Sequence, residues 1–350
     1  MMPALMRHPI LLMLFLSLLA GCQPTTKEYR TTLINWGTLI DISFWGIEKD
    51  KADEVIKEVE KDLQYMNYAW HAWQPGPIGR INKLLQTTAT FSANPSVLGP
   101  IVKARQLAVA SDHLFNPAIS ELIKLWGFHS DDLPKGPPPS AEKIKSLLAN
   151  NPRMDDISIN SVRMKSRNPH VKLDLGGVAK GYGIEQIMGL LKKRGINNAI
   201  VNAGGDLKAI GQHGDRLWKV GIRHPRQKQR VLASLDVKDG ESVFTSGDYE
   251  RYYDYQGRRY HHIIDPRTGY PAQGTRSVTL IHSDATTADA AATALFVAGA
   301  KDWQKIARQM GIQAVMLVDD TGTIHITPEM HARVRFTEPQ PRLRVSTVRP

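Results

Sequence analysis

Along the first half of this chain, apolar residues recur at the three- and four-residue spacing that is typical of amphipathic helices. The clearest run has charged residues between its apolar positions: Val55, Ile56, Val59, Leu63 and Met66. The same spacing predicts shorter helices near residues 81–85, 102–109, 118–125 and 140–148. Residues 31–44, rich in threonine, isoleucine and aromatic side chains, precede these helices and are predicted to be extended.

From residue 157 onward the pattern changes to short alternating segments, which are typical of strands separated by turns. Residues 157–164 and 171–175 are predicted to form a hairpin, and a helix is predicted from Gly176-Gly177 to about Lys193. The remaining predicted strands are 198–202, 218–223, 231–237, 242–245, 259–264, 277–281, 314–318 and 324–326, and the remaining helices are 285–298 and 303–310. Because strands and helices do not alternate regularly, we predict an α+β fold rather than a doubly wound parallel sheet.

Composition adds limits to this picture. The 350 residues are 42% hydrophobic and 23% charged, which is ordinary for globular proteins and excludes disorder as a description of the whole chain. The net charge of +11 is spread along the sequence without a basic block, so we expect no nucleic-acid partner. The last residues, 337–350, are basic and rich in proline, and we predict that they form a flexible tail.

The single cysteine, Cys22, follows an apolar run at residues 10–20 that is too short to span a bilayer comfortably. Leu19-Ala20-Gly21-Cys22 resembles the bacterial lipoprotein signal, which implies cleavage before Cys22 and a lipid on that cysteine. Residues 1–21 would be the signal peptide and residues 22–30 a tether that holds the domain on the periplasmic side of the inner or outer membrane. An ordinary secretory signal with an incidental cysteine is the alternative.

The segment from Asp174 to Gly181 is the first of three polar, glycine-bearing segments that could carry chemistry. A predicted strand ends at an acidic residue, two glycines let the backbone approach a ligand closely, and a helix then begins with free amides. This arrangement could hold a phosphate group near Lys180. The alternative is a plain turn between a strand and a helix, whose glycines only satisfy turn geometry.

The second segment places His262 at the end of a predicted strand, where a general base could meet a substrate hydroxyl. Because neighbouring residues of a strand point to opposite faces, His261 and His262 cannot bind a metal together from one face. For each histidine taken alone, the alternative is a surface strand residue.

In the third segment, Asp289 and Thr293 are four residues apart, so they share one face of a predicted helix. A carboxylate and a hydroxyl suit Mg²⁺, which takes few protein ligands and completes its shell with water and phosphate oxygens. Helix capping by Asp284 or Thr287, with Thr293 satisfied in the core, is the alternative.

Five motifs in order carry a resemblance to a known family: Asp-x-Gly-Gly-x-Ala-Lys-Gly at 174–181, Asn-Ala-Gly-Gly-Asp at 202–206, Thr-Ser-Gly-Asp-Tyr at 245–249, His-Ile-Ile-Asp-Pro-Arg-Thr-Gly at 262–269 and Ala-Asp-Ala-Ala-Ala-Thr-Ala at 288–294. In this succession the chain resembles the ApbE family, the FAD:protein FMN transferases. The resemblance implies a T-fold-related α+β architecture of mixed antiparallel sheets with packed helices. It also implies that residues 31–336 form one flavin transferase domain.

The resemblance also implies roles for individual residues. Mg²⁺, or Mn²⁺ in its place, would bind the carbonyl of Gly177 and the side chains of Asp289 and Thr293, and His262 would deprotonate the acceptor threonine. The residues expected to contact FAD are Trp36, Trp73, Leu114, Phe115, Asn116, Asp174, Lys180 and Ile264. The chain departs from the family at Asn116, where an aspartate is common, and in the loop after Trp73, which usually contains a serine.

By the same resemblance, the reaction transfers FMN from FAD to a threonine of an acceptor protein and releases AMP. Acceptors in this family resemble flavin-bearing subunits of membrane redox complexes. Two alternatives stay open at this point: an FAD pyrophosphatase that uses water in place of the threonine, and a lipoprotein that binds flavin without turnover.

Overall fold

A nine-stranded sheet forms the centre of the molecule in the computed structural model, which describes residues 28–337 and 341–348. Across the sheet the strands are β1 (Glu28–Asn35), β2 (Thr38–Trp45), β6 (Ala199–Ala203), β7 (Asp206–Ile210), β10 (Ser242–Gly247), β13 (Thr275–His282), β14 (Ala314–Asp319), β15 (Ile324–Ile326) and β17 (Leu343–Val345). Neighbouring strands are antiparallel except β15 and β17, which are parallel. The prediction of an α+β fold is confirmed.

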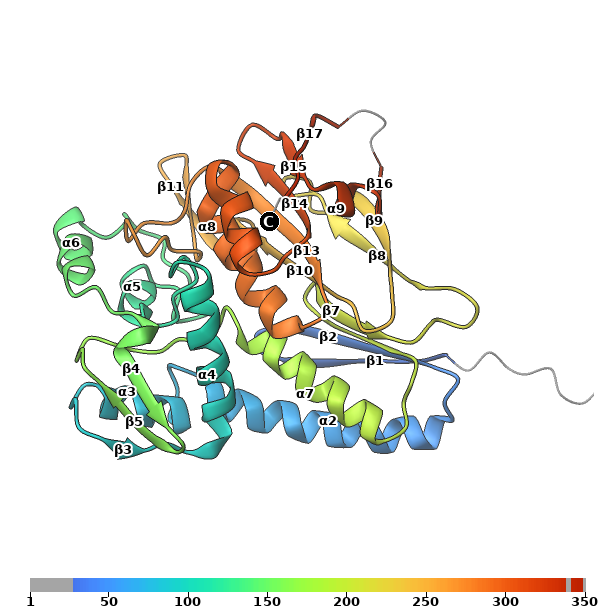
Figure 1. Cartoon of the computed structure of the whole chain (residues 1–350), viewed down its shortest axis with the longest axis horizontal. Helices are drawn as coiled ribbons and strands as arrows, with labels where there is room; N and C mark the ends of the chain where they lie inside the picture. The colour runs from blue at the N-terminus through green and yellow to red at the C-terminus, as the bar shows by residue number, and fades with distance from the viewer. Residues whose placement is uncertain (1–27, 338–340, 349–350) are drawn as a thin grey trace, which may run out of the picture.

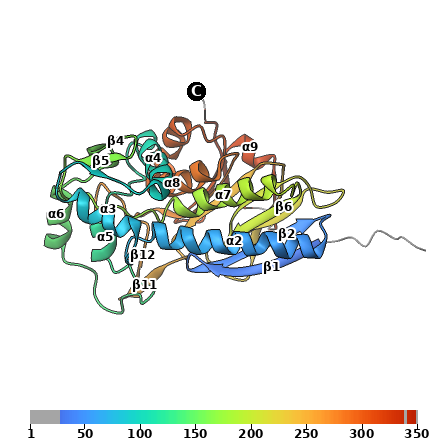
Figure 2. The ribbon, with the colours of Figure 1, turned by 90° about the horizontal axis from the view of Figure 1, so that it is seen from below.

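Four long helices pack together beside this sheet (Figures 1 and 2). They are α2 (Lys49–Trp70), α4 (Pro95–Ala110), α7 (Ala179–Lys193) and α8 (Ala285–Gln309). Alanines fill the middle of α8 and are completely or almost completely buried, so neighbouring elements approach the helix closely. Gly299 has a φ of 66° and kinks α8, which explains why its two ends read as separate helices in the sequence.

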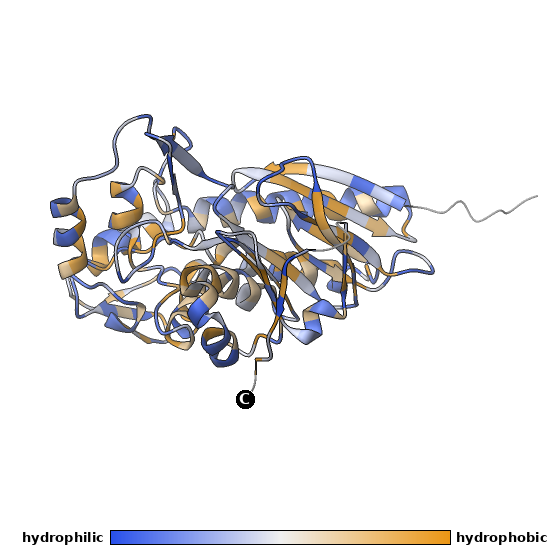
Figure 3. Cartoon of the chain, turned by 90° about the horizontal axis from the view of Figure 1, so that it is seen from above, coloured by the Kyte–Doolittle hydropathy of each residue, from blue (hydrophilic) through white to orange (hydrophobic). Residues whose placement is uncertain are grey.

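Smaller elements surround this core. One group lies beside α4 in Figure 1 and contains α3 (Pro77–Leu85), α5 (Ser120–Leu125), α6 (Ala141–Ala149), a 3₁₀ helix (Met154–Asp156) and the sheet of β3 (Phe91–Ser92), β5 (Arg163–Ser166) and β4 (Ile157–Asn160). The others are the sheet of β16 (Val334–Phe336), β9 (Val231–Val237) and β8 (Trp218–Arg223), the hairpin of β11 (Tyr252–Tyr255) and β12 (Arg258–His261), and α9 (Pro328–His331). The surface helices carry hydrophilic and hydrophobic bands, as their periodicity predicts (Figure 3).

The predicted hairpin between residues 157–164 and 171–175 is wrong. Instead, β4 and β5 pair with each other across a turn at Ser161-Val162. Residues 171–175 bond to the segment before α5: the Asp174 N–H donates to the Pro117 carbonyl over 2.8 Å. Their alternating pattern reflects burial between packed loops and not membership in a sheet.

The prediction of a flexible tail over residues 337–350 differs from the structure in its middle. Residues 343–345 form β17, which extends the free edge of β15. Leu343 packs against an apolar cluster that includes Ile324 and Ile326, and this contact explains the ordered strand. Cys22 and the predicted signal peptide lie outside the described residues. Within the described part of the chain, no helix combines the length and apolarity that crossing a membrane requires.

Candidate active site

A cavity of about 650 Å³ opens where the β1–β2 turn, the start of α7, the first turns of α8 and the segment after β12 meet. The twelve residues that the sequence analysis assigned to the catalytic, metal and FAD sites all line this cavity: Trp36, Trp73, Leu114, Phe115, Asn116, Asp174, Gly177, Lys180, His262, Ile264, Asp289 and Thr293. Their gathering is an observation of the structure, whereas their individual roles stay predictions.

Asp289 is a buried residue of the cavity lining, and its Oδ2 accepts a hydrogen bond from the Gly181 N–H over 2.8 Å. Gly181 permits this contact because a Cβ there would come within 2.8 Å of the Asp289 Cβ. Burial raises the pKa of Asp289 to about 7, and Asp206 adds to the rise while Lys180 opposes it. Burial thus disfavours the ionised carboxylate more than Lys180 favours it.

Thr293 lies one helical turn beyond Asp289, and its Oγ1 is 3.5 Å from the Ser246 Oγ. The Gly177 backbone is adjacent, since a Cβ on Gly177 would lie 3.5 Å from the same Oγ1. The sequence alternative of helix capping is also realised, because Asp284 caps α8 by accepting from the Thr287 N–H over 2.6 Å. Capping thus uses different residues and leaves Asp289 and Thr293 facing the cavity.

These oxygen groups fit a divalent cation of the Mg²⁺ type. The described residues contain no group of three or more His, Cys, Asp or Glu side chains arranged to hold a metal, so an all-protein cage is absent from this part of the chain. Mg²⁺ needs no such cage because it keeps several waters and substrate phosphate oxygens. A cation beside Asp289 would favour the ionised form of this carboxylate, which burial disfavours.

Lys180 forms an ion pair with Asp206, whose other oxygen accepts from the Thr245 N–H over 3.0 Å. Burial lowers the pKa of Lys180, but Asp206 and Asp289 more than offset it and the net pKa is raised. Lys180 therefore stays protonated as a fixed cation beside the oxygen cluster. The sequence analysis did not assign Asp206 to the site, although it closes the Asn-Ala-Gly-Gly-Asp motif and could have been found there.

His262 follows β12, and its Nδ1 lies 3.2 Å from the Arg251 carbonyl oxygen. Because a carbonyl only accepts, the hydrogen bond assigns the proton to Nδ1 and leaves Nε2 as an acceptor. Burial, with the nearby His261 and Arg251, lowers the pKa of His262 to about 3, so the imidazole is neutral near pH 7. A neutral ring with a free nitrogen can take a proton from a hydroxyl.

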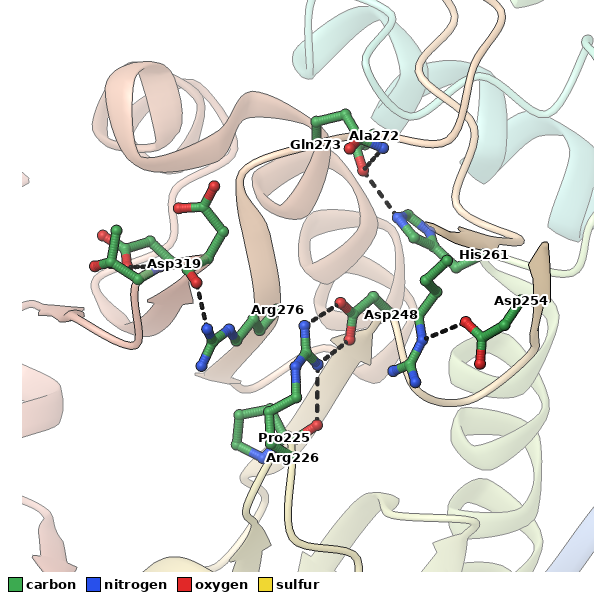
Figure 4. A network of polar contacts seen from close by, with 12 residues as sticks. Pro225, Arg226, Asp248, Asp254, His261, Ala272, Gln273, Arg276 and Asp319 are labelled. Atoms are coloured by element: carbon green, nitrogen blue, oxygen red, sulfur yellow. Dashed lines mark hydrogen bonds and ion pairs between the residues drawn. The ribbon is translucent and has the colours of Figure 1, made fainter. Parts of the chain in front are cut away.

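His261 points away from this site, as the alternation of a strand predicts. Its Nε2 lies 2.8 Å from the Ala272 carbonyl oxygen (Figure 4), and its ring packs edge-on against Phe296. Figure 4 also shows Arg226 bonded to Asp248 by two hydrogen bonds, next to the strand that leads into the site. His261, Arg226 and Asp248 are not among the residues that line the cavity.

Aromatic rings form another part of the cavity lining. The Trp73 Nε1–H donates to Asp174 Oδ2 over 3.1 Å, which joins residues 101 positions apart. Trp36 occupies the β1–β2 turn with a φ of 52°, and its buried Nε1 has no hydrogen-bond partner among the described residues. The unpartnered donor and the flat rings suit a planar ligand with polar edges.

Asn116 has a structural role in its loop. Its Oδ1 accepts from the Ala118 N–H over 3.1 Å, and its Nδ2 donates to the Pro152 carbonyl over 2.9 Å. An ionised aspartate, which is common here in the family, could accept the first hydrogen bond but could not donate the second. The asparagine at position 116 thus makes a hydrogen bond to the Pro152 carbonyl that an ionised aspartate could not make.

The cavity brings together a protonated lysine, a neutral histidine, a cluster of oxygen groups and aromatic rings, an arrangement that suits a planar, phosphorylated ligand. The chain belongs to the ApbE family, because the sequence model of the family described as "ApbE family" matches residues 36–316. The resemblance seen in the motifs is confirmed.

Curated relatives and solved structures agree with this membership. A FAD:protein FMN transferase of Rhodobacter capsulatus is 39% identical over 311 residues, which are 89% of this chain and 59% of that protein. A FAD:protein FMN transferase of Klebsiella pneumoniae is 33% identical over 240 residues, covering 67% of this chain and 72% of the relative. The crystal structure of the ApbE protein from Thermotoga maritima superposes with a TM-score of 0.80 at 32% identity, covering 88% of this chain and all of that one.

Proposed function

We propose that this protein cleaves the pyrophosphate of FAD in the presence of Mg²⁺, attaches FMN through a phosphoester to a threonine of an acceptor protein, and releases AMP. The observation that supports it most strongly is the convergence of His262, Lys180 and the Gly177, Asp289 and Thr293 oxygens on one cavity. Relatives named FAD:protein FMN transferase support the same activity.

The residues divide the chemistry among them. Nε2 of His262 takes the proton of the acceptor hydroxyl, and the hydroxyl oxygen forms a new bond to the phosphorus of the FMN half. The bond between that phosphorus and the bridging oxygen breaks, and AMP leaves with the electron pair. Lys180 lowers the cost of the negative charge that builds up on the phosphate oxygens.

A divalent cation on Gly177, Asp289 and Thr293 would neutralise phosphate charge in the attacked pyrophosphate. Mg²⁺ is the proposed metal and Mn²⁺ the substitute. Trp36 and Trp73 hold the flat rings of FAD and exclude water from them.

Hydrolysis of FAD is the competing activity, because water could take the place of the threonine in the same cavity. Binding without turnover is the third possibility, but storage of flavin requires neither a free imidazole nitrogen nor an oxygen cluster. The names of the relatives favour transfer.

The test uses the chain from Gln23 onward, FAD, Mg²⁺ and the flavin-free extracytoplasmic domain of a redox-complex subunit that carries an acceptor threonine. We expect intact-mass spectrometry to show the gain of one FMN phosphoester on the acceptor, absent with EDTA. AMP released without a gain in mass would indicate hydrolysis or an unsuitable acceptor, and the absence of both products would indicate flavin binding alone.

We also propose that a lipid on Cys22 anchors the protein on the periplasmic side of a bacterial membrane, near acceptor subunits of membrane redox complexes. The lipoprotein-like segment Leu19-Ala20-Gly21-Cys22 supports this location. Substitution of Cys22 by serine should move the protein from the membrane fraction to the soluble fraction. Continued membrane association of that variant would contradict the anchor.

A further inference from the structure

The strand at one edge of the nine-stranded sheet, β1, leads into a turn that lines the cavity. Within the described residues, β1 is the first strand of the sheet and has only β2 as a neighbour. Proteins usually protect such edges with charges, prolines or bulges. The half of β1 nearest the cavity has none of these, since Thr31–Ile34 is uncharged and pairs with β2 in unbroken register.

The hairpin geometry shows which backbone groups of β1 face the open side. Asn35 pairs with Thr38 across the two-residue turn Trp36-Gly37, both of which have positive φ. In such a turn the closing pair exchanges hydrogen bonds and the next pair, Ile34 and Leu39, does not. The Leu39 carbonyl accordingly accepts from the Gly204 N–H over 3.1 Å, on the side away from β1. By the same alternation, the N–H and C=O of Ile34 point toward the open edge.

The side chains at this end of the hairpin are apolar and exposed. Ile34 is 81% exposed, the largest value among the large hydrophobic side chains of the described residues, and Leu39 opposite it is 55% exposed. Between Ile34 and Leu39, the residues Trp36 to Thr38 of the turn line the cavity. An exposed apolar pair with a free backbone edge thus continues directly into the wall of the site.

We propose that the acceptor protein docks along β1 as an added extended strand, with one of its apolar side chains on Ile34 and Leu39. This inference rests on the proposed function, because FMN transfer requires a polypeptide hydroxyl to reach His262 in the cavity that the β1–β2 turn also lines. An added strand gains affinity from main-chain hydrogen bonds and is held in register by side-chain contacts. It therefore brings a threonine to the cavity mouth in a fixed orientation.

The test compares Ile34→Ser and Ile34→Pro with a control, Val231→Ser. Ile34→Ser removes apolar contact, whereas Ile34→Pro also removes an N–H that β2 does not use. Val231 is an exposed strand residue of β9, outside the nine-stranded sheet, and is 43% exposed. For each protein, FAD affinity is measured by fluorescence titration, and FMN transfer is measured as a function of the concentration of the acceptor domain described above.

We expect both Ile34 variants to raise the KM for the acceptor about tenfold, as for a central contact of an interface, with FAD affinity unchanged. The control should match the wild type. If Ile34→Pro perturbs FAD affinity, Ile34→Ser alone decides the question. An unchanged acceptor KM in the Ile34 variants would overturn the docking site.

Two other outcomes have separate meanings. Failure of the wild-type protein to modify the acceptor would count against the proposed function and not against the docking surface. A wild-type dimer that Ile34→Ser converts to monomer, with the acceptor KM unchanged, would assign this edge to self-association and overturn the proposal. Sedimentation velocity on the wild type and Ile34→Ser separates this case.

Discussion

Two glycines of α7 provide a matched test of how the aromatic wall of the cavity is built. A Cβ at Gly189 would meet nothing within 4 Å. A Cβ at Gly183 would lie 2.3 Å from Cη2 and 2.5 Å from Cζ2 of Trp36. The same change to alanine therefore places a methyl group in open space at Gly189. At Gly183 it places the methyl group against the ring of Trp36, which lines the cavity.

In a helix interior, alanine is favoured over glycine by about 1 kcal/mol. Gly189→Ala should gain this amount, which for a domain of this size raises Tm by about 2 °C. Gly183→Ala has the same propensity gain, but the Trp36 ring must retreat from 2.3 Å to at least the 3.4 Å of an ordinary contact. Since Trp36 closes the β1–β2 turn, its retreat moves the turn and should weaken FAD binding about tenfold, or 1.4 kcal/mol.

Thermal unfolding and FAD fluorescence titration of the wild type, Gly183→Ala and Gly189→Ala measure both effects. We expect Gly189→Ala to be more stable with unchanged FAD affinity, and Gly183→Ala to bind FAD more weakly whatever its Tm. Normal FAD affinity in Gly183→Ala would refute the placement of Trp36 as a wall of the flavin site. Weakened affinity in both variants would show that α7 tolerates no added methyl group and that Trp36 is not the cause.

Three further predictions concern charges and protons. Asp289→Asn keeps an acceptor for the Gly181 N–H but loses the carboxylate. Metal-dependent AMP release should therefore fall about 100-fold, with Tm unchanged or higher, and full activity would remove the metal assignment. His262→Ala should slow FMN transfer by about 10²–10⁴ and alter FAD affinity less, and an equal loss in both would make His262 a binding residue. Burial alone would raise the pKa of Asp319, but hydrogen bonds from Thr321, His325 and backbone amides lower it to about 2. This lowering stabilises the fold by about 2 kcal/mol above pH 4, and the stabilisation is lost progressively as the pH falls through the folded pKa. The difference in unfolding free energy between wild type and Asp319→Asn, measured by urea titration, should therefore narrow as the pH falls from 4 to 2. A difference that stays the same over this interval would contradict the linkage.

The sequence predicts helices correctly where apolar residues recur on one helix face. The spacing of Val55, Val59 and Leu63 predicts α2, and these residues are buried as expected. The pairing of strands is harder to predict, because alternation shows which face of a strand is buried but not which other strand lies beside it. Residues 171–175 illustrate this limit: the N–H and C=O of Leu173 bond to the Asn82 side chain, 91 positions away, and no local pattern encodes that contact.

Site residues could be proposed from their types and local spacing. Asp289 and Thr293 share a helix face because the α-helical repeat places residues i and i+4 together, whatever surrounds the helix. Alternation along a strand likewise separates His261 from His262. These relations depend only on backbone geometry within one element, so the sequence by itself determines them.

Relations between distant elements required the tertiary structure. The packing of separate elements brings Lys180 to Asp206. It also places Gly183 against Trp36 while Gly189, on the same helix, faces open space. Burial likewise makes His262 neutral and disfavours the ionised form of Asp289. Desolvation and long-range charge depend on which surfaces meet in space, whereas the spacing of residues along one helix or strand depends on the backbone alone.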